Sequence, residues 1–186
     1  GVIGCEYATI FAAMGCKVYL VNSSDRILPF LDNEISQALV TQMQEDGVEI
    51  LFNTQTEEML VPENIEDDIH IRLSDGTEFD VDMFLFAAGR SGTTKALDCD
   101  KAGVELGKRE AVEVDENYQT SQENIYAVGD VIGFPALAST SMDQGRVAVS
   151  KIFEIHDLDA LPKVFPYGIY TIPEVSMVGI TEEQAQ

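Results

Sequence analysis

Hydrophobic and polar positions in the first 52 residues alternate between helical and strand patterns. Residues 3–15 are mostly helix formers with small side chains, and the segment ends at Gly15. "CKVYLVN" is a short apolar, β-branched run, typical of a buried parallel strand. Residues 33–46 predict a second helix, and "VEILF" predicts a second strand. Strand, helix and strand at this spacing indicate a βαβ crossover and therefore a parallel sheet.

The predicted second helix has clear signals at both ends. Asp32 is a candidate N-cap, and Gly47 follows the last turn, where glycine commonly ends a helix. Its apolar positions Ile35, Leu39 and Met43 recur every four residues. We therefore expect these three side chains to form the buried stripe.

Between residues 55 and 82 the pattern changes to short alternating segments. "TEEML", "DIHIRLS" and "FDVD" predict a small antiparallel meander, and Asp75-Gly76 is a hairpin signal. The acidic stretch "PENIEDD" predicts a solvated loop.

The rest of the chain adds two apolar runs and one helix. "MFLFAAG" and "ENIYAVGD" each predict a buried strand. Residues 138–156 predict a helix, and the last prolines lead into a new strand. The apolar face expected for this helix comprises Met142, Val149, Ile152 and Phe153. The predicted fold class is therefore α/β: a Rossmann-like parallel sheet with crossover helices and an antiparallel meander.

Charge and cysteine content narrow the functional classes. Acidic residues outnumber basic ones by 33 to 11, so the net charge of −22 disfavours binding to nucleic acid or to an anionic membrane. Solubility explains this charge most simply, while a salt-rich cytoplasm or an acidic docking face stays open. No apolar run is long enough to span a membrane. Three cysteines without a CxxC spacing predict a reducing, cytoplasmic location and no zinc site.

The first residues match half of a dinucleotide-binding loop. Gly1 and Gly4 fit the second and third glycines of G-x-G-x-x-G, and a helix and a strand follow. Such glycines allow the backbone to approach a pyrophosphate at the helix N-terminus. A packing glycine at a helix start is the alternative. Since the first glycine and its strand are absent, we expect this chain to be a piece cut inside the loop.

The end of the first predicted strand bears on the choice of cofactor. A carboxylate there favours NAD, whereas arginines favour NADP. Asn22, Ser23 and Ser24 are neutral and form hydrogen bonds, so they predict tolerance of both NAD and NADP. Ordinary turn residues are an equally good interpretation of these three positions.

Two later segments resemble a known family. "AAGRSGTT" and "TSQENIYAVGDVIGFPALASTSMDQGRVA" are similar, in order and spacing, to signatures of the FAD-dependent pyridine nucleotide-disulfide oxidoreductase family. The resemblance implies an NAD(P)-binding domain at 1–91, a returning part of an FAD domain at 92–165, and the start of an interface domain at 166–186.

The resemblance also implies roles for single residues. Gly89 and Arg90 would mark the crossing into the FAD domain, and Gly129 would precede Asp130, whose carboxylate would bind the flavin ribityl chain. The helix starting at Ala138 would direct its N–H groups to the flavin pyrimidine. We expect no catalytic acid or base and no metal ligand in this segment.

Two residues of the first helix would face the flavin in the family. Glu6 would pair with a lysine beside the flavin ring, although the helix dipole alone also favours an acid there. Val2 would lie where the nicotinamide enters.

Within the family, "GDVIGFPALAS" and "YGIYTIPEVSMVGITEEQ" are most similar to transhydrogenases, which move hydride from NADPH to NAD+ through FAD. A lipoamide dehydrogenase-like or other disulfide reductase is the alternative, and a stand-alone nucleotide-binding or oligomerisation module is a further one. The parent is expected to be a homo-oligomer through its C-terminal domain. The piece alone is expected to be inactive, binding nicotinamide dinucleotides weakly and FAD hardly at all.

Overall fold

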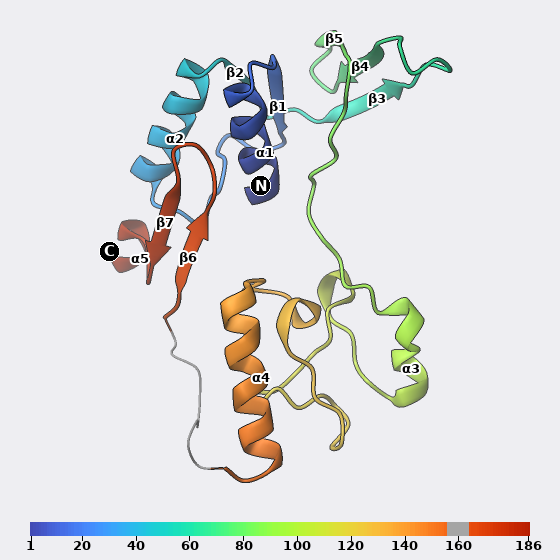
Figure 1. Ribbon diagram of the computed structural model, residues 1–186, viewed down its shortest axis with the longest axis vertical. Helices are drawn as coiled ribbons and strands as arrows, with labels where there is room; N and C mark the ends of the chain where they lie inside the picture. Colours follow the sequence, from blue (N-terminus) through green and yellow to red (C-terminus); the bar gives the residue numbers. More distant parts are fainter. Residues whose placement is uncertain (156–163) are drawn as a thin grey trace. The chain divides into compact units, whose positions relative to one another are not determined.

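The computed structural model describes residues 1–155 and 164–186 (Figure 1). The chain forms two compact units, one of Gly1–Gly89 with Gly168–Gln186 and the other of Arg90–Tyr167. The predicted end of the last helix, at residue 156, lies outside the described residues. Assignment of the predicted domains to particular cofactors stays a prediction.

The first unit begins with the predicted βαβ arrangement. Its elements are α1 (Val2–Ala13), β1 (Val18–Asn22), α2 (Asn33–Glu45) and β2 (Val48–Phe52). Strands β1 and β2 run parallel, with Val18 opposite Val48 and Asn22 opposite Phe52. The parallel crossover is therefore confirmed. It places the carboxyl ends of both strands at one edge of the sheet.

Helix α2 has the predicted ends but a different buried face. Asp32 is its N-cap, and Gly47 follows the helix with a φ of +91°, a left-handed conformation that favours glycine. The predicted stripe is wrong at Ile35, which is 45% exposed, whereas Leu39 and Met43 are buried. Ser36 and Val40 complete the buried face, and the Ser36 hydroxyl donates to the Ile27 carbonyl at 2.7 Å. A polar side chain thus enters the core because a backbone acceptor is available there.

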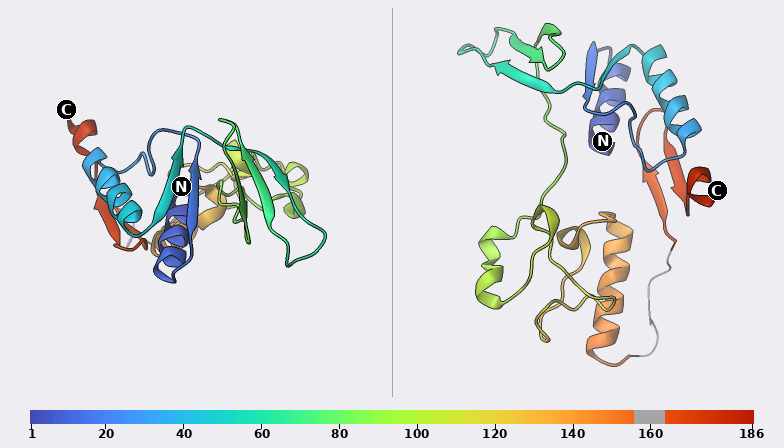
Figure 2. Two further views of the ribbon diagram at one scale, coloured as in Figure 1. Left: turned by 90° about the horizontal axis from the view of Figure 1, so that it is seen from above. Right: turned by 180° about the vertical axis from the view of Figure 1, so that it is seen from behind.

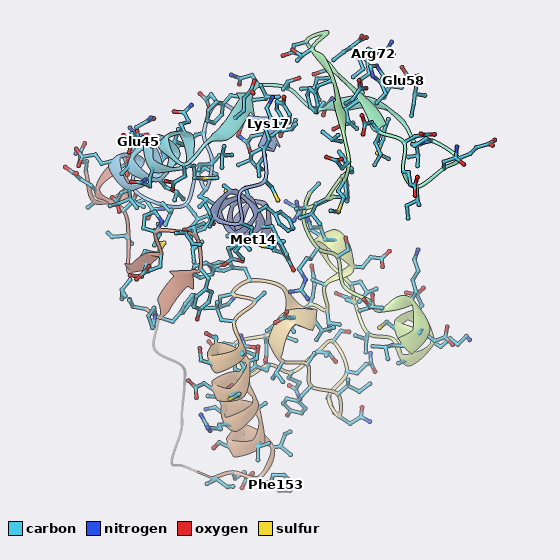
Figure 3. The ribbon with its side chains drawn as sticks, turned by 45° about the horizontal axis from the view of Figure 1, so that its top comes forward. Met14, Lys17, Glu45, Glu58, Arg72 and Phe153 are labelled. Atoms are coloured by element: carbon cyan, nitrogen blue, oxygen red, sulfur yellow. The ribbon has the colours of Figure 1, made fainter. Side chains whose placement is uncertain are left out.

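The meander is confirmed. Strands β3 (Thr56–Leu60), β4 (Ile69–Leu73) and β5 (Glu78–Val81) pair antiparallel in the order β3-β4-β5. They form the green-to-teal sheet in the left view of Figure 2. Arg72 and Glu58 lie side by side on it at 2.8 Å (Figure 3).

A short hairpin and helix end the chain, as the sequence predicted for the strand. They are β6 (Pro166–Ile169), β7 (Val175–Val178) and α5 (Glu182–Ala185). Two backbone N–H groups of this segment bind α1: Tyr170 donates to Glu6 Oε1 at 2.9 Å, and Ile172 donates to Thr9 Oγ1 at 3.1 Å. In Figure 1 the red hairpin accordingly lies beside the blue helices.

A second pair of bonds holds the same segment to the start of α2. The Glu182 N–H donates to Asp32 Oδ1 at 2.6 Å, and the Asn33 N–H donates to Glu183 Oε1 at 2.9 Å. Asp32 therefore binds α5 rather than capping its own helix with its side chain. That residues 166–186 begin a dimerisation domain stays a prediction.

The second unit has one long helix and several short ones. They are η1 (Lys95–Leu97), α3 (Cys99–Ala102), η2 (Lys108–Glu110), η3 (Gly129–Ile132) and α4 (Ala138–Ile152). Its core contains Cys99, Val104 and Val112.

Two predicted strands are wrong. Residues 83–89 form no strand, and Met83 and Phe86 are 86% and 78% exposed. Residues 123–130 contain only an isolated bridge, between Gln119 and Tyr126, before the turn η3. A strand requires a neighbouring backbone to satisfy its N–H and C=O groups. Neither segment has such a partner strand among the described residues, and an apolar run in a sequence does not reveal this.

The predicted apolar face of α4 is also wrong. Met142, Val149, Ile152 and Phe153 are all exposed, and Phe153 lies at the far end of the helix (Figure 3). The buried side chains are instead Thr140, Gln144, Val147, Ala148 and Ser150. This face mixes polar and apolar side chains, and its Gln144 binds the turn that contains Gly129, described below. No helix among residues 1–155 and 164–186 is long and apolar enough to cross a membrane.

Candidate functional site

The N-terminus of α1 has the properties of an anion-binding site. The helix begins at Val2 with Gly1 as its N-cap, and its first intrahelical bond runs from the Cys5 N–H to the Gly1 carbonyl at 3.0 Å. None of the described side chains caps this end, and the first turn contains no acid. The first N–H groups therefore keep their hydrogen-bonding capacity, and the helix dipole adds positive potential there.

Gly4 brings this helix close to its neighbours. A Cβ atom at Gly4 would lie 3.6 Å from both Leu20 of β1 and Ala87. This is ordinary van der Waals contact, so α1 packs directly against the first strand. The predicted helix and the parallel strand that follows it are present, while phosphate binding at the helix start stays a prediction.

Asn22, Ser23 and Ser24 lie at the carboxyl end of β1, where open α/β sheets bind ligands. The Asn22 side-chain amide donates to the Ser24 carbonyl at 2.9 Å and to the Arg26 carbonyl at 3.2 Å. Two N–H groups beyond β2 bind the same loop: Thr54 donates to the Asn22 carbonyl and Asn53 to the Ser24 carbonyl. The loop is therefore built into the edge of the sheet. Ser23 is exposed.

Glu6 and Val2 lie on the first turns of α1, as predicted. The Glu6 carboxylate accepts the Tyr170 N–H, so within the described residues it holds the C-terminal hairpin. Its pairing with a lysine beside a flavin stays a prediction, as does the position of Val2 at the nicotinamide. Sequence reasoning missed Thr9, whose hydroxyl donates to the Glu6 carbonyl while accepting the Ile172 N–H.

The second candidate site lies around Gly129 and Asp130. The Arg90 guanidinium donates to Asp130 Oδ2 at 2.9 Å, and the two side chains are 66% and 46% exposed. This ion pair is open to solvent, so a ligand hydroxyl can reach the carboxylate. Gly89, the preceding residue, has a φ of +114°.

Gln144 of α4 positions this turn. Gly129 has a φ of +79°, and its N–H donates to Gln144 Oε1 at 2.6 Å in a buried environment. A Cβ atom at Gly129 would lie 3.2 Å from the Ser141 hydroxyl, so the turn lies against the first two turns of α4. Sequence reasoning gave Gln144 no role, although "DQGR" belongs to the segment that carries the family resemblance. A polar residue within a helix does not reveal a distant N–H partner.

Replacing Gln144 by leucine should lower the free energy of unfolding by about 1–3 kcal/mol, because the buried Gly129 N–H loses its acceptor. Urea denaturation of the full-length protein measures this. Gln122→Leu is the matched control, since its amide makes an exposed bond to Gly103, and it should change stability by less than about 0.5 kcal/mol. Equal stability of the two variants would contradict the role of Gln144.

Helix α4 begins at Ala138 without a side-chain cap and without an acid in its first turn. Its first turn lies next to the Gly129–Asp130 turn, since a Cβ atom at Gly129 would lie 3.2 Å from the Ser141 hydroxyl. A carboxylate acceptor beside uncapped helix donors can bind the hydroxyls and the polar ring edge of a flavin. The chain's own residues therefore fit the FAD contacts that the sequence predicted for them.

In the part of the chain that the structure describes, other chemistry-bearing groups form no further catalytic cluster. Residues 1–155 and 164–186 contain no group of ligands arranged to hold a metal, and Cys5, Cys16 and Cys99 are all free. Burial raises the pKa of the Cys5 thiol, which makes it a poor nucleophile. His70 pairs with Asp80 at 2.8 Å on the meander.

Comparison with known proteins gives a consistent result. Residues 1–145 match the profile of the pyridine nucleotide-disulphide oxidoreductase family. The chain is 46% identical over 184 residues to the soluble pyridine nucleotide transhydrogenase of Sodalis glossinidius, and 47% identical to that of Vibrio parahaemolyticus. Each match covers 99% of this chain but 39% of the relative, so the chain spans about two fifths of these relatives' length.

Solved structures of similar fold include the HOCl-induced flavoprotein disulfide reductase RclA of Escherichia coli in its Cu(II) complex. It shares 31% identity and a TM-score of 0.88, and the match covers 100% of this chain and 42% of that one. LpdA of Mycobacterium tuberculosis shares 25% identity with a TM-score of 0.89, and covers 99% of this chain and 39% of that one.

Proposed function

The chain belongs to the pyridine nucleotide-disulphide oxidoreductase family, and from this premise we propose that its full-length protein is a transhydrogenase that moves hydride from NADPH to NAD+. The observation that carries the proposal is the identity of 46–47%, over almost the whole chain, to proteins named soluble pyridine nucleotide transhydrogenase. The mixed α/β fold and the two candidate nucleotide sites described above support it.

FAD, when bound, supplies the redox chemistry by taking hydride from one nicotinamide and giving it to the other. The chain contributes binding and orientation. The uncapped N-terminus of α1 would hold the dinucleotide pyrophosphate, and Gly4 keeps that helix against β1. Asp130 would accept hydrogen bonds from the ribityl chain, next to the N–H groups that begin at Ala138. No described side chain is needed as an acid or base.

A second candidate is a flavoprotein disulfide reductase, which the likeness to RclA favours. That reaction needs a pair of redox cysteines. The three cysteines of this chain, Cys5, Cys16 and Cys99, lie too far apart in sequence for the closely spaced pair of such reductases. The reductase would have to supply it from sequence outside these 186 residues.

One assay of the full-length protein separates the two. Purified protein with bound FAD is mixed with NADPH and thio-NAD+, and reduction of the thio-NAD+ is followed by absorbance. Turnover at about 1–1,000 s⁻¹, the usual range of enzymes, is expected. Lipoamide or another disulfide replaces thio-NAD+ in a parallel reaction. Turnover with the disulfide alone would reject the transhydrogenase in favour of the reductase.

We further propose that the full-length protein is a cytoplasmic homo-oligomer that assembles through its C-terminal domain. The absence of any disulfide among the three cysteines supports a reducing compartment. Light scattering coupled to size-exclusion chromatography tests the assembly, and a monomeric mass would refute that part.

A further inference from the structure

The contacts of the loop after β1 bear on the sequence-based expectation that it tolerates both NAD and NADP. We propose that this loop selects NAD over NADP, with Asn22 as the residue that determines the preference. The inference rests on the proposed function, because it takes the end of β1 as the site of the adenosine ribose.

The first step is the orientation of the Asn22 side chain. One of its two terminal atoms lies within hydrogen-bond distance of the Ser24 carbonyl, the Ser24 hydroxyl and the Arg26 carbonyl, at 2.9, 3.0 and 3.2 Å. Backbone carbonyls only accept hydrogen bonds, so this atom is the amide nitrogen. Its N–H donors are therefore all directed to acceptors within the loop. The oxygen Oδ1, which only accepts, has no partner among the described residues.

The neighbouring Ser24 hydroxyl is also used as a donor within the loop. It donates to the Arg26 carbonyl at 2.9 Å. Only the hydroxyl of exposed Ser23 is left to donate among the three side chains. A ribose 2′-hydroxyl can donate to Asn22 Oδ1, whereas a 2′-phosphate needs several donors and meets an acceptor instead.

Arg26 is the only basic residue in positions 18–32. Its guanidinium donates to the Leu31 carbonyl, and its Nε is buried without a hydrogen bond among the described residues. The pKa of the Glu183 carboxyl is lowered mainly by backbone hydrogen bonds, and the Arg26 charge adds to the effect. Arg26 is thus already engaged by the Leu31 carbonyl. Exposed Asp25 and the net charge of −22 further oppose the extra phosphate of NADP.

The test measures the dissociation constants of NAD+ and NADP+ for the full-length protein by isothermal titration. AMP and adenosine 2′,5′-bisphosphate are measured in parallel, because they isolate the adenosine end. We expect NADP+ to bind at least about tenfold more weakly than NAD+. Adenosine 2′,5′-bisphosphate should likewise bind more weakly than AMP.

Ser24→Arg should lower the ratio of the NADP+ dissociation constant to the NAD+ dissociation constant at least about fivefold, because it places a cation beside the ribose position. Thr41→Arg is the matched control: it makes the same charge change on the exposed surface of α2 and should leave the ratio unchanged.

The outcomes are separable. Equal affinities, or tighter binding of NADP+, would overturn the selectivity while leaving the transhydrogenase proposal in place. A fall in the ratio with Thr41→Arg as large as with Ser24→Arg would assign the effect to net charge and overturn the role of the loop. Failure of both dinucleotides to bind, together with no hydride transfer, would remove the proposed function and the inference with it.

Discussion

Replacing Gly92 by alanine is expected to lower the free energy of unfolding by about 3 kcal/mol, with loss of structure in residues 90–155. A Cβ atom at this position would lie 2.3 Å from the Glu110 carbonyl oxygen and 2.9 Å from its carbon. Both atoms belong to the backbone, so no flexible side chain can move aside.

The surroundings of Gly92 leave little freedom to relax. The Gly92 N–H donates to the Arg109 carbonyl at 2.8 Å, and the buried Thr94 hydroxyl donates to the Glu110 carbonyl at 3.1 Å. Arg109 and Glu110 also have positive φ angles, of 57° and 59°. The clash therefore has to be relieved by breaking these hydrogen bonds.

Urea denaturation followed by far-UV circular dichroism measures the effect in the full-length protein. Gly145→Ala is the matched control in the same unit, since a Cβ there meets nothing within 4 Å. Gly145 lies inside α4, so alanine should raise stability by about 0.5–1 kcal/mol. A Gly92→Ala protein as stable as the wild type would refute the packing of this segment.

Replacing Asp130 by alanine is expected to weaken FAD binding about 10- to 100-fold. A hydrogen bond from a ligand hydroxyl to a carboxylate contributes about 1.5–3 kcal/mol, and each 1.4 kcal/mol is a factor of ten. Protein stability without FAD should change by less than about 1 kcal/mol, because the Arg90–Asp130 pair is solvent-exposed. Titration of the FAD-free full-length protein with FAD measures the first quantity, and urea denaturation the second.

Asp143→Ala is the control for this prediction. Asp143 forms a comparable exposed ion pair with Arg146 on α4, so its removal costs the same kind of interaction without touching the Gly129 turn. It should leave FAD affinity unchanged. Retention of FAD within twofold by Asp130→Ala would show that this carboxylate does not bind the flavin.

Local features of the sequence were sufficient for several elements. The helix-strand-helix-strand order of residues 2–52 follows from periodicity that repeats within each segment, and Gly47 marks a real helix end. The meander follows from alternating residues and the Asp75-Gly76 turn. These signals extend over only a few residues, so they can be recognised without knowing the rest of the fold.

Other features depend on groups that are distant in the sequence. The runs 83–89 and 123–130 have the composition of strands but no neighbouring strand among the described residues. Helix α4 buries Gln144, which accepts the Gly129 N–H, together with Val147 and Ala148, while the predicted apolar stripe is exposed. The hairpin contacts of Glu6 and Thr9 join residues more than 160 positions apart.

The sequence by itself determined the α/β fold class and the family, since glycines, turns and strand ends are encoded locally; the positions of the two nucleotide-binding segments stay predictions. Only the tertiary structure decided which faces are buried and which donors are free. Asn22 illustrates the difference. Its identity indicated a neutral hydrogen-bonding residue, whereas its contacts with Ser24 and Arg26 occupy the amide nitrogen and leave only the oxygen, an acceptor, for a ligand. A side-chain amide can both donate and accept, and its hydrogen bonds to the surrounding backbone determine which of the two groups remains available to a ligand.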